Sequence, residues 1–143
     1  LGASATPMAY GELYTGLQSG VVEAAENNTI YYFSQKHYEV APYFSKTNHV
    51  VGLDYVIINT KKLEGMSDED RQVFDDGWAA TWDEHTELWD QATIDSEVGA
   101  EEGGATITEV SGDEFSKALE AIPEEYISND NQQELWDNAR EGQ

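Results

Sequence analysis

One long helical segment lies in the middle of the sequence, and it restricts what the rest of the chain can fold into. It opens at Met66-Ser67-Asp68-Glu69-Asp70, which has the pattern of a capping box and puts acidic side chains at the positive end of the helix dipole. Apolar residues then recur every three to four positions, at Val73, Phe74, Trp78, Trp82, Trp89 and Ile94. We therefore expect a long helix that opens at this capping box, buries this aromatic side and runs to about Ala100, before Gly103-Gly104.

Shorter elements are expected on both sides of this helix. Before it, the sequence predicts a helix over residues 7–18 with Thr6 as N-cap and a stop at Ser19-Gly20, a short buried strand at Val21-Val22, an aromatic helix over residues 30–40 capped by the turn at 26–29, and strands at 43–45 and 55–58, the second of them central. After it come a strand over residues 105–110, a helix capped by Ser111-Gly112-Asp113, and a last amphipathic helix around Leu135 and Trp136. No Gly/Ser-rich or Pro-rich linker marks a domain boundary.

The charge balance narrows the classes of partner. Among 143 residues there are 29 Asp and Glu against 7 Lys and Arg, a net charge of -22, and arginine occurs only at Arg71 and Arg140. Each phosphate contact needs a cation, so binding to nucleic acid or to anionic lipid is disfavoured. Most of the acid follows Gly65, which indicates a solvated helical surface that promotes solubility.

Redox, membrane and targeting signals are missing from these residues. The chain has no cysteine and hence no disulfide or thiolate zinc site. Its longest apolar stretches, such as Val56-Ile57-Ile58, are far shorter than the roughly 18 to 20 residues of a spanning helix. The start at Leu1-Gly2 has neither an initiator Met nor a signal peptide, and we interpret it as the interior of a longer gene product.

Signatures of catalysis and of metal binding are also missing. The sequence has no GxSxG, P-loop or GxGxxG pattern. His37, His49 and His85 lack the spacing of a zinc site, so we expect no metal and no cofactor, with His37 as a packing residue. A carboxylate pair such as Glu12 and Glu23 could serve a glycosidase as acid and base, but a chain with 29 acidic residues always offers such a pair.

Aromatic and amide side chains form a more informative grouping. Its members are Tyr10, Tyr31 and Tyr32 with Asn27, Asn28 and Gln35. Such residues can stack on a sugar-like ring and fix its hydroxyls and carboxylate with neutral hydrogen bonds. The alternative is that the tyrosines belong to the core and have satisfied hydroxyls. Separately, His49 lies between strands in a loop with Asn48 and Asp54, where polar groups can converge on a ligand.

Ordered motifs along most of the chain resemble one protein family. Residues 2–27, from Gly2-Ala3-Ser4-Ala5-Thr6-Pro7-Met8 to Glu26-Asn27, are similar to the GA-x-PTPMAFSEVY-x-ALQ-x-GVVDGQEN stretch of the DctP-type substrate-binding proteins of TRAP transporters. Lys36-His37-Tyr38-Glu39-Val40 is similar to that family's KFYEV or KHYEV, and Thr47-Asn48-His49 to its TNH or TEH. The run from Leu63 to Asp70 resembles the W-x-x-L-x-x-ED motif that precedes the family's long helix.

The resemblance implies the later half of a two-lobed α/β fold, like that of type II periplasmic binding proteins. Residues 1–65 would form part of the second, carboxylate-side lobe, residues 66–102 a long interlobe helix, and residues 103–143 a C-terminal strand and helices packing on the lobes. It also implies a non-enzymatic, extracytoplasmic receptor with its signal peptide upstream. That receptor would deliver a uronate, another sugar acid or a C4-dicarboxylate-like acid to the membrane components of a TRAP transporter.

The resemblance also assigns roles within the ligand site. Asn27 would hydrogen-bond the ligand carboxylate and Tyr10 would stack on the ligand, while Asn28, His49 and Asp54 would address hydroxyl groups. The family's carboxylate-clamping arginine precedes its PTPM motif, and because no arginine precedes the long helix here, that clamp would lie outside this chain. The doubled Asn27-Asn28 resembles the subgroup that binds uronates and related sugar acids.

Two other functions stay open, and so does the assembly. The chain could belong to a carbohydrate-active enzyme that uses a carboxylate pair, or be a stand-alone acidic interaction module with no small-molecule pocket. Its predicted strands would leave sheet edges unpaired, which invites pairing with another chain. We therefore expect either the missing N-terminal half or self-association with a second copy to complete the sheet.

Overall fold

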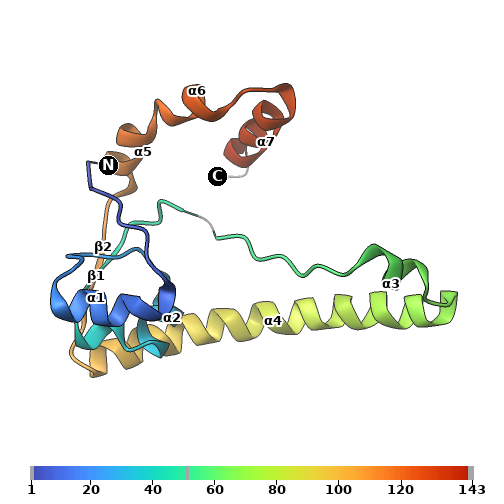
Figure 1. The fold of residues 1–143 in the computed structure, drawn as a ribbon, viewed down its shortest axis with the longest axis horizontal. Helices are drawn as coiled ribbons and strands as arrows, with labels where there is room; N and C mark the ends of the chain where they lie inside the picture. The colour runs from blue at the N-terminus through green and yellow to red at the C-terminus, as the bar shows by residue number, and fades with distance from the viewer. Residues whose placement is uncertain (1, 51, 142–143) are drawn as a thin grey trace. The chain divides into compact units, whose positions relative to one another are not determined.

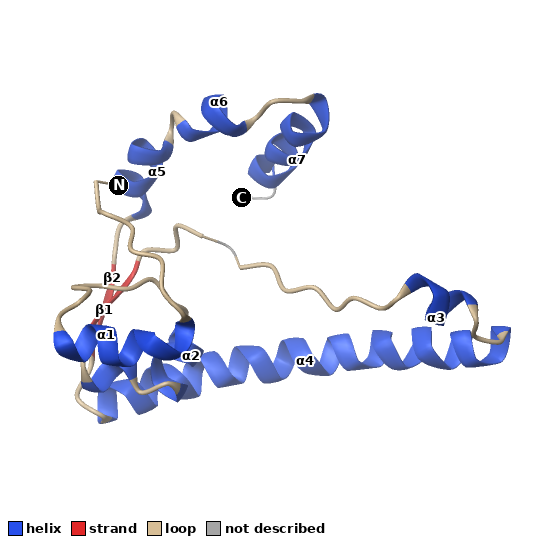
Figure 2. Ribbon diagram, in the orientation of Figure 1, coloured by secondary structure: helices blue, strands red, loops and turns tan. Residues whose placement is uncertain are grey.

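The structure, a computed structural model, describes residues 2–50 and 52–141 (Figure 1). It divides into two units. The larger comprises Thr6–Ser45 and Gly52–Thr108, and the smaller comprises Leu1–Ala5, Lys46–Val51 and Glu109–Gln143. Helices make up most of the regular structure in the described residues, and strands are confined to one pair (Figure 2).

The larger unit contains the long helix and most of the short elements. In chain order these are a 3-10 turn at Tyr10–Glu12, α1 (Leu13–Ser19), α2 (Thr29–Ser34), a 3-10 turn at His37–Glu39, β1 (Tyr43–Lys46), α3 (Thr60–Glu64), α4 (Asp68–Glu102) and β2 (Thr106–Glu109). Strands β1 and β2 pair in a two-stranded sheet, which confirms the strands expected at 43–45 and 105–110. Their last residues, Lys46 and Glu109, belong to the smaller unit and form an ion pair with an N–O distance of 2.9 Å.

The smaller unit carries three helices after β2. These are α5 (Gly112–Leu119), α6 (Ile122–Tyr126) and α7 (Asp130–Glu141). Ser111 caps α5 by accepting a hydrogen bond from the Asp113 N–H, as its sequence predicts. Pro123 stands in the first turn of α6, where a missing N–H costs little.

Helix α4 begins and ends close to where its sequence predicts. The hydroxyl of Ser67, its N-cap, accepts a hydrogen bond from the Asp70 N–H at 3.1 Å and donates one to the Asp70 carboxylate at 2.8 Å. The first of these bonds is that of a capping box, whereas the carboxylate meets the Ser67 hydroxyl instead of its backbone N–H. The helix continues to Glu102, where Gly103 follows as its C-cap, so the long helix is confirmed.

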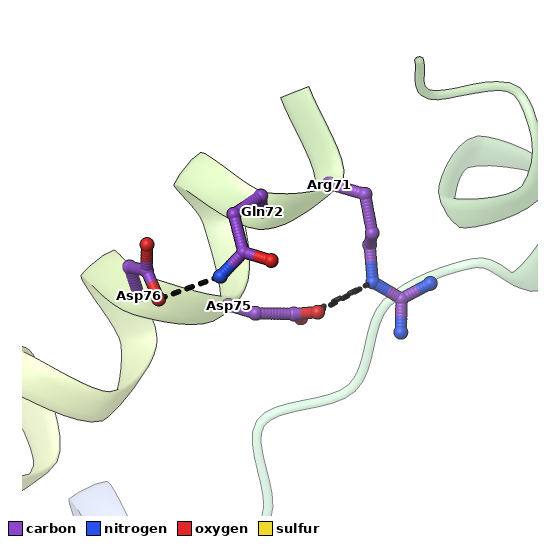
Figure 3. Close-up of polar contacts among 4 residues, drawn as sticks. All are labelled: Arg71, Gln72, Asp75 and Asp76. Atoms are coloured by element: carbon purple, nitrogen blue, oxygen red, sulfur yellow. Dashed lines mark hydrogen bonds and ion pairs between the residues drawn. The ribbon is translucent and has the colours of Figure 1, made fainter. Parts of the chain in front are cut away.

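Pairs of side chains one turn apart support the first turns of α4 (Figure 3). The Arg71 Nε lies 3.1 Å from both carboxylate oxygens of Asp75. The Gln72 amide donates to the Asp76 carboxylate at 2.8 Å. Each such i,i+4 pair stabilises a helix by only about 0.2–0.5 kcal/mol.

The predicted burial of the aromatic side of α4 is wrong for the described residues. From Asp68 to Gln91, every side chain that the structure describes is exposed, and Val73 and Trp82 keep 68% and 56% of their surface accessible. The physical reason is that α2 packs against the C-terminal end of the helix and leaves its first part uncovered. Within the described part of the chain, no helix combines the length and apolar character needed to span a bilayer.

The packing of α2 against the C-terminal end of α4 forms the centre of the larger unit (Figure 1). Ser96 and Ala100 of α4 are buried, and Gly99 faces the Phe33 ring so closely that a Cβ at Gly99 would lie 2.6 Å from it. A Cβ at Gly103 would lie 2.5 Å from the Tyr38 ring. Glycines in the last turn of α4 and at its C-cap therefore allow two aromatic rings to approach the backbone.

The Tyr32 side chain anchors α2 from within. It is 96% buried, its ring centroid lies 4.7 Å from that of Phe44 on β1, and its hydroxyl donates to the Ala41 carbonyl at 2.7 Å. Burial raises the pKa of this hydroxyl. Tyr32 thus belongs to the core with a satisfied hydroxyl, as the alternative interpretation of the tyrosines expected for this residue.

Two expected features of the first forty residues differ in the structure. The first helix begins with the 3-10 turn at Tyr10 rather than at Pro7, and its N-cap is Ala9, whose side chain has no hydrogen-bonding group. The aromatic helix over 30–40 is interrupted, because Lys36 adopts a left-handed conformation with φ of 58° between α2 and the 3-10 turn at His37–Glu39. The predicted stop at Gly20, with φ of 73°, and the predicted capping turn before α2 are confirmed.

Two predicted strands are wrong. Val21-Val22 follows the Gly20 turn without forming a strand, and Val21 is 69% exposed. Residues 55–58 run outside any sheet in the described part of the chain, with Ile57 89% exposed. A strand needs a neighbour for its backbone N–H and C=O groups, and the described residues offer these segments none.

Candidate functional site

The site begins at the turn that starts α2. The Asn28 side chain caps this helix by accepting a hydrogen bond from the Tyr31 N–H at 2.9 Å. The side-chain oxygen of Asn27 accepts one from the Asn28 N–H, also at 2.9 Å. The two asparagines therefore organise the turn by different means, and Asn27 directs its amide nitrogen away from its own backbone.

Two side chains from other segments of the larger unit meet at that nitrogen. The Asn27 Nδ2 donates to the Tyr10 hydroxyl at 3.2 Å and lies 3.4 Å from the His37 Nδ1. The Tyr10 ring packs edge-on against His37, with ring centroids 6.1 Å apart. We call Tyr10, Asn27, Tyr31 and His37 the tyrosine–asparagine cluster. It joins the start of the chain to the region around α2.

The cluster has an accessible side and a buried side. Tyr10 and Tyr31 are 51% and 42% exposed, with their rings packed edge-on at 6.3 Å, whereas His37 is only 4% exposed. Accessible aromatic rings beside amide and hydroxyl groups can contact the apolar face of a sugar while hydrogen-bonding its substituents. The arrangement can therefore bind a small polar ring, and the described residues include no group of His, Asp and Glu that could hold a metal ion.

Burial lowers the pKa of His37 below its ordinary value of 6.5. The unfolded chain therefore takes up a proton at His37 as the pH falls through about 6.5, while the folded chain resists protonation. Stability contributed by the neutral imidazole is present above this pH and is lost below it.

We expect wild-type protein to lose stability relative to His37→Phe between about pH 7 and pH 5. The variant keeps an aromatic ring but has no titrating group, and the many carboxylates contribute equally to both proteins. Urea unfolding at a series of pH values measures the difference. Parallel pH profiles for the two proteins would contradict the buried, neutral assignment of His37.

The Asn28 cap allows a separate test of structure. Asn28→Ala should lower the free energy of unfolding by about 1 kcal/mol, because the Tyr31 N–H loses its acceptor. Asn28→Asp should unfold at nearly the wild-type urea concentration, since Asp caps helices as well as Asn does. Equal stability of Asn28→Ala and wild type would show that this hydrogen bond does not stabilise α2.

Asp54 lies in a different environment, in an extended segment beside α4. Together with Tyr55 and Val56 it lines a groove of about 460 Å³ whose other wall includes Trp78 and Trp82 of the helix. No hydrogen bond or ion pair in the described residues joins Asp54 to the tyrosine–asparagine cluster. Tyr55 and three tryptophans of α4 contribute aromatic rings to this groove, and the role expected for Asp54 stays a prediction.

His49 belongs to the smaller unit. Its Nδ1 lies 2.6 Å from the Thr47 hydroxyl, and its ring stacks on Phe115 of α5 with centroids 6.0 Å apart. These residues, with Asn48, line a pocket of about 190 Å³. Of the five residues expected at the ligand site, the structure brings Tyr10, Asn27 and Asn28 together, while Asp54 and His49 line separate cavities.

The sequence-based interpretation missed the connection between His37 and Asn27. His37 was expected to pack, and its burial agrees with that expectation. Its hydrogen bond to an amide ten residues earlier was not expected. The available signal was a polar aromatic residue close to an asparagine pair, but the contact depends on the interruption of the helix at Lys36, which the local pattern does not indicate.

Comparison with known proteins identifies the family of this chain. Residues 1–130 match the family described as bacterial extracellular solute-binding protein, family 7. The ectoine/5-hydroxyectoine-binding periplasmic protein of Ruegeria pomeroyi is 36% identical over 97 residues, which are 68% of this chain and 28% of that protein.

Solved structures extend the comparison to the fold. A TRAP periplasmic solute-binding protein of Xanthobacter autotrophicus, with bound beta-D-galacturonate, has a TM-score of 0.85 and 26% identity over 93% of this chain and 45% of its own. One from Chromohalobacter salexigens, with bound D-glucuronate, has a TM-score of 0.84 and 30% identity over 99% of this chain and 48% of its own. The chain thus spans less than half of each of these proteins. The similarity of the two structures confirms the expected α/β fold of two-lobed solute-binding proteins. The chain belongs to family 7 of the bacterial extracellular solute-binding proteins, as its DctP-like motifs predict.

Proposed function

We propose that this chain supplies part of the ligand site of a TRAP transporter's solute-binding protein, and that the ligand is a uronate or a closely related sugar acid. The observation that carries the proposal is the tyrosine–asparagine cluster, which presents accessible aromatic rings beside neutral hydrogen-bonding groups. Solved relatives that hold D-galacturonate and D-glucuronate support a ligand of this class.

The chemistry of the cluster suits one part of such a ligand. Ring faces of tyrosine cover the apolar face of a pyranose, and amide and hydroxyl groups pair with its oxygens. A carboxylate also needs positive charge, and the net charge of -22 works against an anion at long range. The family resemblance provides that charge as an arginine outside these residues, which would complete the site with Asn27 and Asn28.

The proposal is for binding without chemical change, outside the cytoplasm and in partnership with the membrane components of the transporter. Family membership supports binding, since the relatives compared are solute-binding proteins. Glu12 and Glu23, the pair considered for a glycosidase, are both exposed, and no hydrogen bond in the described residues links them. The site therefore gives no support to acid–base catalysis.

Calorimetric titration of the full-length gene product tests the proposal. D-galacturonate, D-glucuronate, ectoine and succinate should be compared, and we expect one-to-one binding of a uronate with weaker or no binding of the others. At a hundred times its Kd, the preferred ligand should stabilise the fold by about 2.7 kcal/mol. Absence of binding to either uronate would overturn the proposal, and conversion of a bound sugar acid, followed by NMR, would indicate an enzyme.

A further inference from the structure

Two tyrosines of one helical stretch form hydrogen bonds to two other segments of the larger unit. The 3-10 turn that begins at Tyr10 continues directly into α1, so Tyr10 and Tyr14 lie about one turn apart on the same side. The Tyr10 hydroxyl accepts from Asn27, in the turn before α2. The Tyr14 hydroxyl donates to the Glu39 carboxylate at 2.9 Å, in the 3-10 turn after α2. The first helix is therefore bonded to the chain on both sides of α2.

His37 connects these two bonds into a closed ring of contacts. It lies in the same 3-10 turn as Glu39, its Nδ1 is 3.4 Å from the Asn27 amide nitrogen, and its ring packs edge-on against Tyr10. A shift of the first helix away from Glu39 would therefore also change the contacts that Tyr10 makes with His37 and Asn27. Through this ring, the bond between Tyr14 and Glu39 can influence the tyrosine–asparagine cluster without belonging to it.

Few other interactions hold α1 in its position. Of the seven residues of this helix, only Gly16 is buried. The Glu39 carboxylate also pairs with the Lys36 ammonium at an N–O distance of 3.7 Å, but both side chains are exposed and such pairs contribute little. A hydrogen bond to an ionised acceptor is roughly twice as strong as one between neutral groups. The Tyr14 hydroxyl is therefore the stronger of the two partners of this carboxylate.

We propose that Tyr14 and Glu39 are positioning residues of the ligand site, and that their hydrogen bond holds Tyr10 in place beside Asn27 and His37. The inference rests on the proposed function. The bond restricts the movement of the cluster before the ligand binds, and preorganisation of this kind raises affinity without adding a contact to the ligand.

Tyr14→Phe is the first test, because it removes the O–H and keeps the ring. We expect the affinity of the full-length protein for its preferred uronate to fall about two- to tenfold in calorimetric titration. Tyr43→Phe is the matched control, since Tyr43 is 82% exposed on β1, and its affinity should equal that of wild type. Wild-type affinity in Tyr14→Phe would overturn the inference.

The acceptor side of the bond provides a rescue experiment. Glu39→Ala should lose about as much affinity as Tyr14→Phe, whereas Glu39→Gln keeps an oxygen that can accept from Tyr14 and should recover most of that loss. The double variant Tyr14→Phe/Glu39→Ala should lose no more than either single variant, because residues that act through one bond are not additive. Additive losses in the double variant would contradict a shared role.

Two NMR readouts distinguish positioning from a role confined to the stability of α1. The hydrogen bond to Glu39 raises the pKa of the Tyr14 hydroxyl above its ordinary value of 10.0, so this tyrosine should ionise at lower pH in Glu39→Ala than in wild type. The ring resonances of His37 should shift in unliganded Tyr14→Phe, because the ring of contacts has lost one member. Unshifted His37 resonances would overturn the positioning role.

These outcomes separate the inference from the proposed function. If wild-type protein binds neither uronate, the proposed function fails, and the positioning role of Tyr14 fails with it. If wild-type protein binds a uronate and Tyr14→Phe binds it equally well, only the inference fails.

Discussion

Asn27→Asp is expected to reduce the affinity for a uronate by roughly a hundredfold or more. An Asp carboxylate cannot donate to Tyr10 or to His37, so the Tyr10 O–H would turn inward to donate to the new acceptor. The variant would thereby lose the amide donor and place a negative charge near the carboxylate of the ligand. Both effects act against an acid, and the second would persist even if Tyr10 kept its position.

Calorimetric titration of the full-length variant measures this loss, and pH 8 keeps His37 neutral. Asn59→Asp is the matched control, because the Asn59 side chain caps α3 by accepting from the Lys61 N–H at 3.0 Å, a role that Asp can also fill. The control should bind the ligand as wild type does. Near-normal affinity in Asn27→Asp, with an intact fold, would remove Asn27 from the site.

Gly99→Ala is expected to lower the free energy of unfolding by about 1–2 kcal/mol. A Cβ at this position would lie 2.6 Å from the Phe33 ring, and the ring has little room to retreat because it stacks on Tyr38 at 5.7 Å. Overpacking of this kind typically costs about 1–3 kcal/mol. The helical preference of Ala over Gly returns only about 0.5–1 kcal/mol of that cost.

Gly77→Ala on the same helix is the natural comparison. No atom lies within 4 Å of a Cβ built at Gly77, so only the helical preference acts, and the change should stabilise the protein by about 0.5–1 kcal/mol. Urea unfolding followed by circular dichroism gives both values. Equal stabilisation by the two substitutions would show that α2 does not pack on Gly99 as described.

Helix caps could be predicted from the sequence because their chemistry is local. Asn28, Ser67 and Ser111 each accept a hydrogen bond from an N–H within three residues, and the short polar side chain is itself the signal. The strands predicted at Val21-Val22 and over 55–58 failed for the opposite reason. A strand is defined by its neighbour, and an apolar run does not reveal whether that neighbour is present.

The site was predictable only in part, for similar reasons. The motif around Tyr10 and the asparagine pair pointed to these residues, and the structure places them together. The hydrogen bond from Asn27 to His37 depends on the left-handed Lys36 between α2 and the next turn, a conformation that is uncommon for lysine. Gly99 was likewise overlooked, because its role lies in the approach of Phe33 from another helix.

Because α2 covers only the C-terminal end of α4, amide hydrogens at the two ends of this helix exchange with solvent by different routes. Near Ser96 and Ala100, an amide can exchange its hydrogen with solvent only after α2 separates, so exchange there reports the opening of the larger unit. From Asp68 to Gln91, exposed side chains leave the backbone protected by helical hydrogen bonds alone, and fraying suffices for exchange. Binding of another molecule to the exposed tryptophans would slow amide exchange along the first part of the helix. Hydrogen exchange in α4 therefore reports whether this face is covered.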